Sequence, residues 1–426
     1  MSKAILITGC AELLSLRGAA PRRGRQFGDL GIIRDGALLI RDGRIAVIGH
    51  RKDLLRSGAA RGATRLDFGG RTVLPGFVDS HTHLVFAASR ATEYEQRISG
   101  ATYEQIARAG GGILSSVKAF RAANPLALKD RAIAALQRMA EHGTTTVEAK
   151  SGYGLNAKSE LATLRLHREL ALHQPIGIVS TFLGAHVVPA EFRKRRNGPD
   201  EYVEYLCRKL IPQVASDGLA DFCDVFCDRG AFSVAQARKV LTAARACGMG
   251  IRIHADQITR TGAARLAVDL HAASADHLER ISSADIRALA KSNTVATLLP
   301  GCHFHLGIPQ KAPARKLIEA GAIVALATDF NPGTSPTLSM PMILSLACDQ
   351  LRMTPTEAIS AATINAAYSL RKHANIGSLE VGKFADLAVF DVADYREIPY
   401  YFGVNLCVLT MKRGKVIYAR AGSGLH

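Results

Sequence analysis

The pattern of apolar and polar positions is the same at the two ends of the chain and different in the middle. Up to about residue 74, and again after about residue 378, short runs of strand type are broken by Asp-Gly or Arg-Gly pairs, at 34–36, 41–43 and 413–414. Asp-Gly between alternating apolar residues is a strong signal for a β-hairpin. Because both ends share this character, we expect residues 1–74 and 378–426 to form one small β-sandwich domain.

The middle, 75–377, repeats a different unit, in which an apolar strand-like run is followed by a polar loop and an amphipathic helix. The eight strand candidates are 73–78, 144–149, 178–183, 222–226, 251–253, 273–276, 295–299 and 323–327. Helix-like runs such as 127–141 and 233–246 lie between them, and Ser233 is suited to be an N-cap. This order predicts an α/β fold, a (β/α)8 barrel of the TIM type. A doubly wound sheet is the rival, but it gives no reason for polar residues to gather after every strand.

Polar side chains of catalytic or ligand type follow the strand candidates. His81 and His83, two positions apart, point to the same side of an extended chain. Later strands are followed by Glu148, Lys150, Tyr153, His186, Asp228, His254, Gln257, His277, Asp329 and Asn331. The carboxyl ends of barrel strands share one face, so these side chains should meet. Any one histidine could be an ordinary polar residue, but imidazoles and a carboxylate gathered there suit zinc or iron, with a position open for water.

Composition excludes several classes of protein. The chain has 426 residues, of which 48% are hydrophobic, so it is globular with a large core. No apolar run approaches the roughly 20 residues that span a bilayer, and residues 1–8 lack the apolar stretch of a signal peptide. The eight cysteines form no CxxC pair, which argues against a disulfide scaffold. We therefore expect a cytoplasmic protein with no membrane partner.

The charge is strongly positive, +17, and basic residues cluster at 21–25 and 51–52. Such a surface could attract nucleic acid or an anionic small molecule. No aromatic residues interleave with the basic cluster, as a nucleic-acid platform would require. We expect a solubilising surface that can also steer an anionic substrate, and no nucleic-acid partner.

Four segments together carry a family resemblance: 75–83 (PGFVDSHTH), 251–256 (IRIHAD), 274–277 (SADH) and 327–329 (ATD). In them the chain resembles the amidohydrolase superfamily, metal-dependent hydrolases on a (β/α)8 barrel, over nearly its whole length. Narrower features lie at 86–94, 109–113, 148–155, 184–186 and 329–334. These are similar to the branch that opens the cyclic amide of 4-imidazolone-5-propanoate to N-formimidoyl-L-glutamate in histidine degradation.

The resemblance implies a role for each matching residue. The ligands of one divalent or trivalent metal ion, zinc or iron, would be His81, His83, His254 and Asp329. Asp329 would also carry a proton from the attacking water to the leaving ring nitrogen, and His277 would orient the water or the carbonyl. Arg90 would bind the substrate's propionate, because a guanidinium pairs with a carboxylate through two hydrogen bonds.

The rest of the substrate pocket is implied in the same way. Its members would be Tyr153, His186, Gln257, Asn331, Gly333 and Thr334, with Tyr103 as a second candidate for the carboxylate. The resemblance also implies a homodimer. Gln257 is an amide, which cannot accept and release a proton at neutral pH, so proton transfer would fall to Asp329 and His277.

Several alternatives stay open. Arg90 could be an ordinary arginine on a helix surface. Lys150 could correspond to the carboxylated lysine that bridges two metals in some amidohydrolases, although that lysine usually follows a different strand. The cluster Cys302-His303-Phe304-His305 could be a loop with incidental histidines or an adventitious metal site. Rival functions are a deaminase or another cyclic amidase on the same fold, and a nucleic-acid-binding protein on an inactive barrel.

Overall fold

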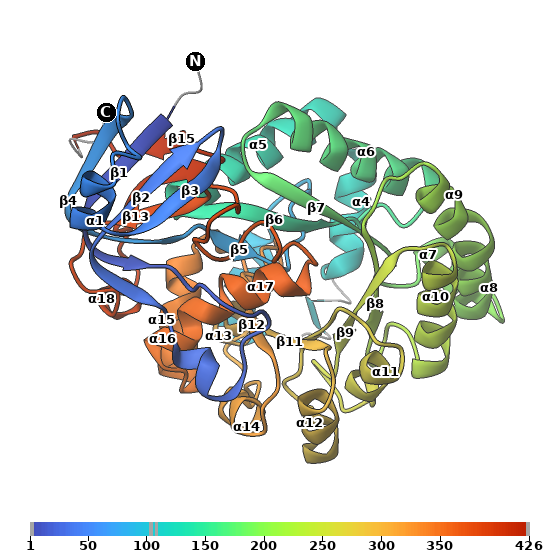
Figure 1. Ribbon diagram of the computed structural model, residues 1–426. Helices are drawn as coiled ribbons and strands as arrows, with labels where there is room; N and C mark the ends of the chain where they lie inside the picture. Colours follow the sequence, from blue (N-terminus) through green and yellow to red (C-terminus); the bar gives the residue numbers. More distant parts are fainter. Residues whose placement is uncertain (1–3, 102–104, 107–109, 423–426) are drawn as a thin grey trace.

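The computed structural model describes residues 4–101, 105–106 and 110–422 and has two sheets (Figure 1). One is a barrel of eight strands in which neighbours along the chain pair in parallel. Its strands are β5 (Phe77–Asp79), β6 (Thr144–Lys150), β7 (Gly177–Ala185), β8 (Phe222–Cys227), β9 (Gly250–Ala255), β10 (Ser274–His277), β11 (Val295–Leu298) and β12 (Val324–Leu326). The predicted (β/α)8 architecture is confirmed.

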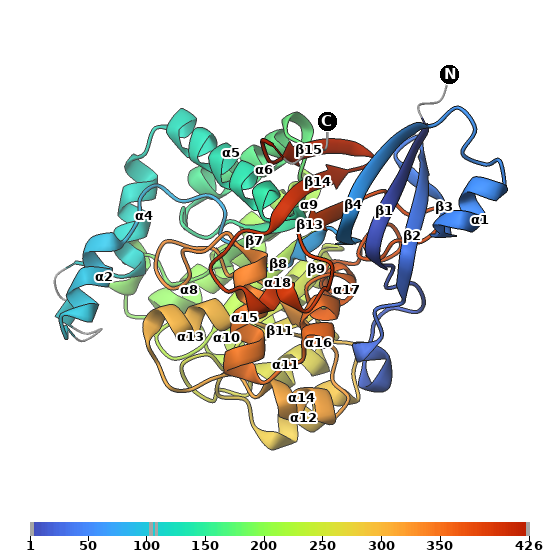
Figure 2. The ribbon, with the colours of Figure 1, turned by 90° about the vertical axis from the view of Figure 1, so that its left-hand side faces the viewer.

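Helices surround the barrel (Figures 1 and 2). The longer ones are α4 (Ile113–Ala122), α5 (Pro125–Glu141), α6 (Ala157–His173), α10 (Val234–Ala246) and α15 (Met340–Leu351). Shorter ones are α8 (Gly198–Tyr205), α9 (Ile211–Ser216), α11 (Ala263–Asp269), α12 (Ser283–Ala290), α13 (Pro300–Leu306), α14 (Ala314–Glu319), α16 (Pro355–Ala361) and α17 (Ile364–Ser369). Ser233 caps α10 as predicted, in a capping box with Gln236 that satisfies free N–H groups of the first turn.

The barrel closes between β5 and the segment that follows β12. Thr82 and Phe330 form a parallel bridge, the His83 N–H donates to the Phe330 carbonyl at 2.8 Å, and the Asp329 N–H donates to the His81 carbonyl at 3.0 Å. The buried Asp79 carboxylate reinforces this closure by accepting from the Thr328 N–H at 3.0 Å. The hydrogen bonds that close the barrel therefore place His81 and His83 beside Asp329.

The second sheet is mixed, with seven strands in the order β15-β14-β13-β4-β1-β2-β3. Its strands are β1 (Ala4–Leu14), β2 (Ile32–Arg41), β3 (Arg44–His50), β4 (Thr64–Pro75), β13 (Leu387–Phe390), β14 (Cys407–Lys412) and β15 (Lys415–Ala419). Both chain ends contribute, as predicted, and Figure 2 shows β1–β4 beside β13–β15 at one end of the molecule. The domain bounds 1–74 and 378–426 stay a prediction.

The sheet bends so that its two parts share one apolar core. Ile7, Ile40 and Phe68 pack in a single cluster with Leu387 and Leu409. The turns at 42–43 and 413–414 meet, so closely that a Cβ on Gly43 would lie 2.7 Å from the Arg413 carbonyl oxygen. The Asp35-Gly36 pair, predicted to be a hairpin turn, instead lies inside β2, because residues 32–34 continue to pair with β1.

The mixed sheet is joined directly to the barrel. β4 runs into β5 through Gly76, whose N–H donates to the Asp386 carbonyl at 3.0 Å. Lys412 of β14 is buried, and its Nζ donates to Asp386 at 2.6 Å and to Thr146 of β6 at 3.0 Å. The first two barrel strands are thus held from outside the barrel. None of the helices in the described ranges is both long and apolar enough to cross a bilayer.

The Lys412 contact generates a prediction about stability. Lys412→Met removes the cation from the buried Asp386 carboxylate, which keeps its backbone donor on Arg413. Leaving a buried charge unpaired typically costs about 3 kcal/mol, so we expect a loss of roughly 3 kcal/mol of unfolding free energy in urea denaturation. Lys415→Met, at an exposed position of β15, is the control and should change the value by less than about 0.5 kcal/mol. Equal effects of the two substitutions would contradict this role.

Candidate active site

Five buried side chains converge at the carboxyl ends of the barrel strands. They are His81 and His83 after β5, His254 in β9, His277 in β10 and Asp329 after β12. Two sets, His81 with His83 and Asp329, and His81 with His254 and His277, each bring their ligand atoms within 4.8 Å of one another. The Nε2 atoms of His81 and His83 both lie 3.5 Å from Asp329 Oδ1.

Buried carboxylates orient two of the histidines. His81 Nδ1 lies 2.8 Å from Asp276 Oδ2, and His254 Nδ1 lies 3.1 Å from Asp224 Oδ2. A carboxylate at that distance keeps the proton on Nδ1 and leaves the Nε2 lone pair free. Neither Nε2 has a hydrogen-bond partner among the described residues. Two buried ring nitrogens without a hydrogen-bond partner, one of them 3.5 Å from the Asp329 carboxylate, are suited to bind a metal ion.

The orienting carboxylates belong to a fully buried ionic network. Lys150 Nζ donates to Glu148 Oε1 and to Asp224 Oδ2, at 2.8 Å each. The Arg252 guanidinium donates to Asp276 Oδ2 at 3.3 Å and to the Ser80 carbonyl at 2.8 Å. Two cations thus face three carboxylates, which leaves one excess negative charge beside the histidine cluster. The Lys150 amine is thus engaged in two ion pairs, with Glu148 and Asp224.

Burial and charge set the protonation of the cluster. Burial lowers the pKa values of His81 and His83 well below the usual value, so both are neutral and able to act as ligands. Burial raises the pKa of Asp329 to about 6, although His277 and His254 oppose this shift. Burial also disfavours the Asp224 carboxylate, but His254 and Lys150 outweigh it and lower the Asp224 pKa.

Arg90 lies beside the loop that carries Asp329. It stands at the N-cap of α2 (Ala91–Ile98), and its side chain is 20% exposed. Its Nε donates to Glu93 Oε2 at 2.8 Å, and Glu93 in turn accepts from Ser115 Oγ at 3.0 Å. A Cβ on Gly333 would lie 2.1 Å from Arg90 Nη1, so any larger residue there would displace the guanidinium from its present position. Arg90 is therefore packed against this loop and not spread on an open helix surface.

The loop 331–334 holds Asp329 in place. Asn331 Oδ1 accepts from the N–H groups of Gly333 and Thr334 at 2.8 and 2.7 Å, and Asn331 Nδ2 donates to the Asp329 carbonyl at 2.6 Å. Thr334 Oγ1 donates to Asp329 Oδ2 at 3.3 Å. Asp329 itself has φ +53°, a left-handed conformation that these bonds stabilise. Asn331 and Thr334, predicted to contact substrate, contact Asp329 in the structure.

Aromatic side chains form one wall of the site. The His186 ring stacks on His83 with centroids 5.2 Å apart, and the Tyr153 ring lies 6.0 Å from His83. His186 Nδ1 lies 3.0 Å from the Gly152 carbonyl, and burial lowers the His186 pKa to about 3, so its neutral ring donates this bond. Gln257 lies on another side and donates from Nε2 to Cys302 Sγ at 3.4 Å. Tyr103 lies outside the described residues.

Sequence reasoning missed four carboxylates that support the site: Glu148 as an ion-pair partner, Asp224, Asp276 and Glu279. Glu279 is buried, and its Oε1 lies 3.8 Å from His277 Nδ1. A signal was present for Asp224 and Asp276, because a carboxylate inside a buried strand is almost never left without a partner. Asp228, which follows β8, accepts instead from the N–H groups of Ile258 and Thr259 and supports a loop.

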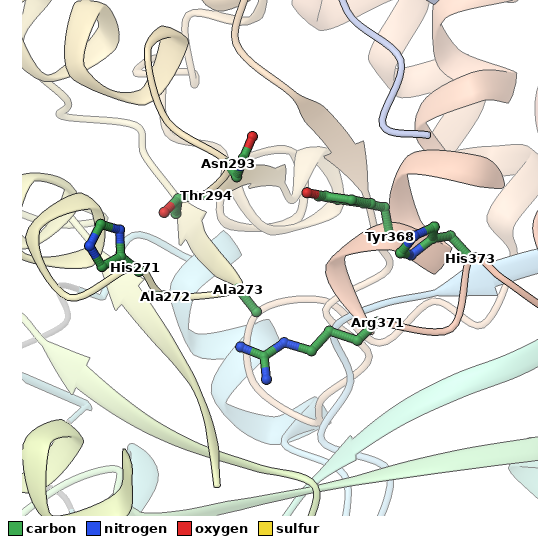
Figure 3. A pocket seen from close by; sticks show the side chains of 8 residues that line it. All are labelled: His271, Ala272, Ala273, Asn293, Thr294, Tyr368, Arg371 and His373. Atoms are coloured by element: carbon green, nitrogen blue, oxygen red, sulfur yellow. The ribbon is translucent and has the colours of Figure 1, made fainter. Parts of the chain in front are cut away.

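Figure 3 shows a separate cavity of the protein. Its volume is about 220 Å³, and its lining includes His271, Thr294, Tyr368 and Arg371. His271 and Thr294 precede β10 and β11, whereas the histidine cluster lies at or beyond the strand ends. This cavity is therefore not part of the candidate active site.

Comparison with known sequences gives matches over nearly the whole chain. A family model described as the amidohydrolase family matches residues 72–417. Proteins named imidazolonepropionase are among the similar relatives. The one from Solibacter usitatus is 47% identical over 423 residues, 99% of this chain and 100% of the relative. The one from Symbiobacterium thermophilum is 46% identical over 415 residues, 97% of each protein.

Solved structures match the fold at low sequence identity. A zinc-bound adenosine deaminase from Xanthomonas campestris has a TM-score of 0.70 at 18% identity, covering 97% of this chain and 93% of its own. A variant of atrazine chlorohydrolase from Arthrobacter aurescens, in complex with zinc and atraton, has a TM-score of 0.71 at 17% identity, covering 97% and 95%. At these identities the matches support the fold alone.

The orientation of His254 can be tested through metal affinity. Asp224→Asn removes the carboxylate charge next to His254 Nδ1, so Nε2 becomes a poorer and less ordered ligand. We expect the affinity for Zn²⁺, measured by competition with a chelator, to fall 10–100-fold, about the usual cost of losing an outer-shell partner. Asp228→Asn, at the residue that directly follows the same strand, is the control and should leave the affinity unchanged. Unaltered affinity in Asp224→Asn would exclude the orienting role.

Proposed function

The chain belongs to the amidohydrolase family and, within it, to the imidazolonepropionases, and we propose that its buried histidine cluster holds the metal ion that this hydrolase uses. The reaction is hydrolysis of the cyclic amide of 4-imidazolone-5-propanoate to N-formimidoyl-L-glutamate. The ligands we assign are His81, His83, His254 and Asp329. The observation that carries this assignment is the pair of unpartnered Nε2 atoms on His81 and His254, because His81 belongs both to a close donor set with His83 and Asp329 and to one with His254 and His277.

We infer that the ion is zinc or iron, and that each chain holds one. Imidazole and carboxylate donors suit both metals. Zinc is present in the deaminase and chlorohydrolase structures that share the fold. When bound, such an ion supplies Lewis acidity that makes water nucleophilic near neutral pH. Lys150, with both carboxylate partners in place, has no free amine to bridge a second ion.

Asp329 is assigned the proton transfer. Water attacks the ring carbonyl carbon, the ring C–N bond breaks, and a proton must pass from the water to the leaving nitrogen. The Asp329 carboxylate lies at the histidine cluster, and Thr334 fixes its Oδ2. Gln257 cannot share this task, because its amide donates to Cys302 and does not titrate near neutral pH.

His277 is assigned the orientation of the reacting groups. Its Nδ1 faces the buried Glu279 carboxylate at 3.8 Å, so its Nε2 is directed toward the cluster. An imidazole held in this way can donate a hydrogen bond to the substrate carbonyl or to the attacking water. The neighbouring carboxylate stabilises the positive charge that the ring would carry.

Arg90 is assigned the substrate's propionate. Glu93 binds its Nε side, whereas Nη1 lies over Gly333 on the loop next to Asp329. A second carboxylate approaching Nη1 would pair with a guanidinium that is already oriented. Tyr153 and His186 line the same site as neutral groups. The predicted homodimer and cytoplasmic location rest on resemblance and composition, and they stay predictions.

Substrate recognition is tested with Arg90→Ala. We expect kcat/KM for 4-imidazolone-5-propanoate, followed by its ultraviolet absorbance, to fall by about 10–150-fold, the cost of a charge-assisted hydrogen-bonded pair. Arg97→Ala is the control on the same helix and should have little effect, because the Arg97 guanidinium donates to the His305 carbonyl and not to the loop beside Asp329 among the residues that the structure describes. Hydrolysis of the ring without its propionate should be insensitive to both changes. Unchanged turnover in Arg90→Ala would exclude the carboxylate assignment.

His277 can be separated from the metal ligands by measuring metal and rate together. In His277→Gln we expect kcat to fall by about 10²–10⁴-fold, as for loss of a positioned acid–base group, while metal content stays near one ion per chain. His254→Gln should lose both metal and turnover. Loss of metal from His277→Gln would show instead that His277 is a ligand.

A further inference from the structure

Cys302 is a buried thiol that the proposed reaction does not use. It lies in the first turn of α13, and its Sγ accepts from Gln257 Nε2 at 3.4 Å. Of the cluster Cys302-His303-Phe304-His305, the thiol is the member that faces the catalytic histidines. The His305 ring stacks instead on Tyr94, with centroids 4.9 Å apart.

The surroundings of Cys302 form a second set of metal-binding donors. Its Sγ, one ring nitrogen of His277 and one carboxylate oxygen of Asp329 lie within 4.8 Å of one another, and all three residues are buried. Ligands of a tetrahedral zinc site are separated by roughly 3.3–3.7 Å, given bond lengths of about 2.0–2.3 Å. Small side-chain movements would therefore bring the three donors onto one cation.

This donor set differs in chemistry from the one assigned to the catalytic ion. The catalytic set contains imidazole and carboxylate only, whereas the second set contains a thiolate, which selects soft cations such as zinc and cadmium. Within the described part of the chain, Cys302 is the one cysteine that belongs to such a group.

We propose that Cys302, His277 and Asp329 form a second, inhibitory site for a soft divalent cation. The thiol releases its proton to water when the cation binds. The cation occupies His277 and shares Asp329, and it breaks the contact between Gln257 and Cys302. The inhibitory effect rests on the proposed function, since His277 and Asp329 then cannot handle the water and the proton. Binding of the cation does not depend on that function.

The site is tested by titrating protein that already holds one zinc ion per chain with CdCl₂. We expect a sulfur-to-cadmium charge-transfer band in the ultraviolet, rising to one equivalent, with parallel loss of turnover. Cys302→Ser should remove the band and raise the inhibitory Cd²⁺ concentration at least about tenfold, relative to its own uninhibited rate. Cys247→Ser, which removes the exposed thiol most accessible to adventitious cadmium, should keep both.

A measurement on the wild-type protein tests the second site without relying on a variant that could fail to fold. The ¹¹³Cd NMR spectrum of the wild-type protein with two equivalents of cadmium should show two resonances, one shifted downfield by a thiolate ligand. A band that persists in Cys302→Ser, a band lost in Cys247→Ser, or no thiolate-shifted resonance would overturn the proposal. Turnover before cadmium is added tests the proposed function, whereas the cadmium band and resonance test the second site. Failure of the proposed function can therefore be distinguished from failure of the second-site proposal.

Discussion

The ionic network inside the barrel is the constraint on which the site depends. Glu148, Asp224 and Asp276 are carboxylates in a water-free interior, where an unpaired charge would be very costly. Lys150 and Arg252 neutralise most of this charge. The same carboxylates face the histidines, because Asp276 accepts a hydrogen bond from His81 Nδ1 and Asp224 lies 3.1 Å from His254 Nδ1. The same ion pairs that lower the cost of burying these charges also keep Nδ1 of each histidine toward a carboxylate and leave Nε2 free for the metal. Stability of the barrel interior and readiness of the ligands therefore have one physical origin.

The backbone hydrogen bonds that close the barrel also connect the stability of the barrel with the position of the ligands. The bonds from Asp329 N–H to the His81 carbonyl and from His83 N–H to the Phe330 carbonyl complete the barrel and set the distance between ligands on its first and last strands. The mixed sheet holds β5 and β6 from outside, through Gly76 and Lys412. Disturbance of this support would shift His81 and His83 relative to Asp329 without touching any ligand.

Much of the fold and part of the site followed from sequence because they depend on local pattern. Strand candidates alternating with helices gave the barrel, and residues just after each strand gave the histidines. The supporting carboxylates were harder to assign, since Asp224 and Asp276 become partners of His254 and His81 only when distant strands are adjacent. The packing of Arg90 on Gly333 is likewise a contact between loops more than 200 residues apart. Asp228 is a case in which the sequence pattern misled. Its position directly after a strand suggested a place in the active site, but its carboxylate accepts from the Ile258 N–H and stabilises a loop.

X-ray absorption spectroscopy of protein loaded with one equivalent of zinc tests the central claim most directly, because it reports the atoms bound to the ion. The arrangement of His81, His83, His254 and Asp329 predicts a first shell of three imidazole nitrogens and oxygen, with no sulfur. Asp276→Asn and Asp224→Asn should each disorder the imidazole scattering without changing the kinds of ligand atom. A sulfur ligand at one equivalent, or fewer than three imidazoles, would show that the buried carboxylates do not aim these histidines at the catalytic ion.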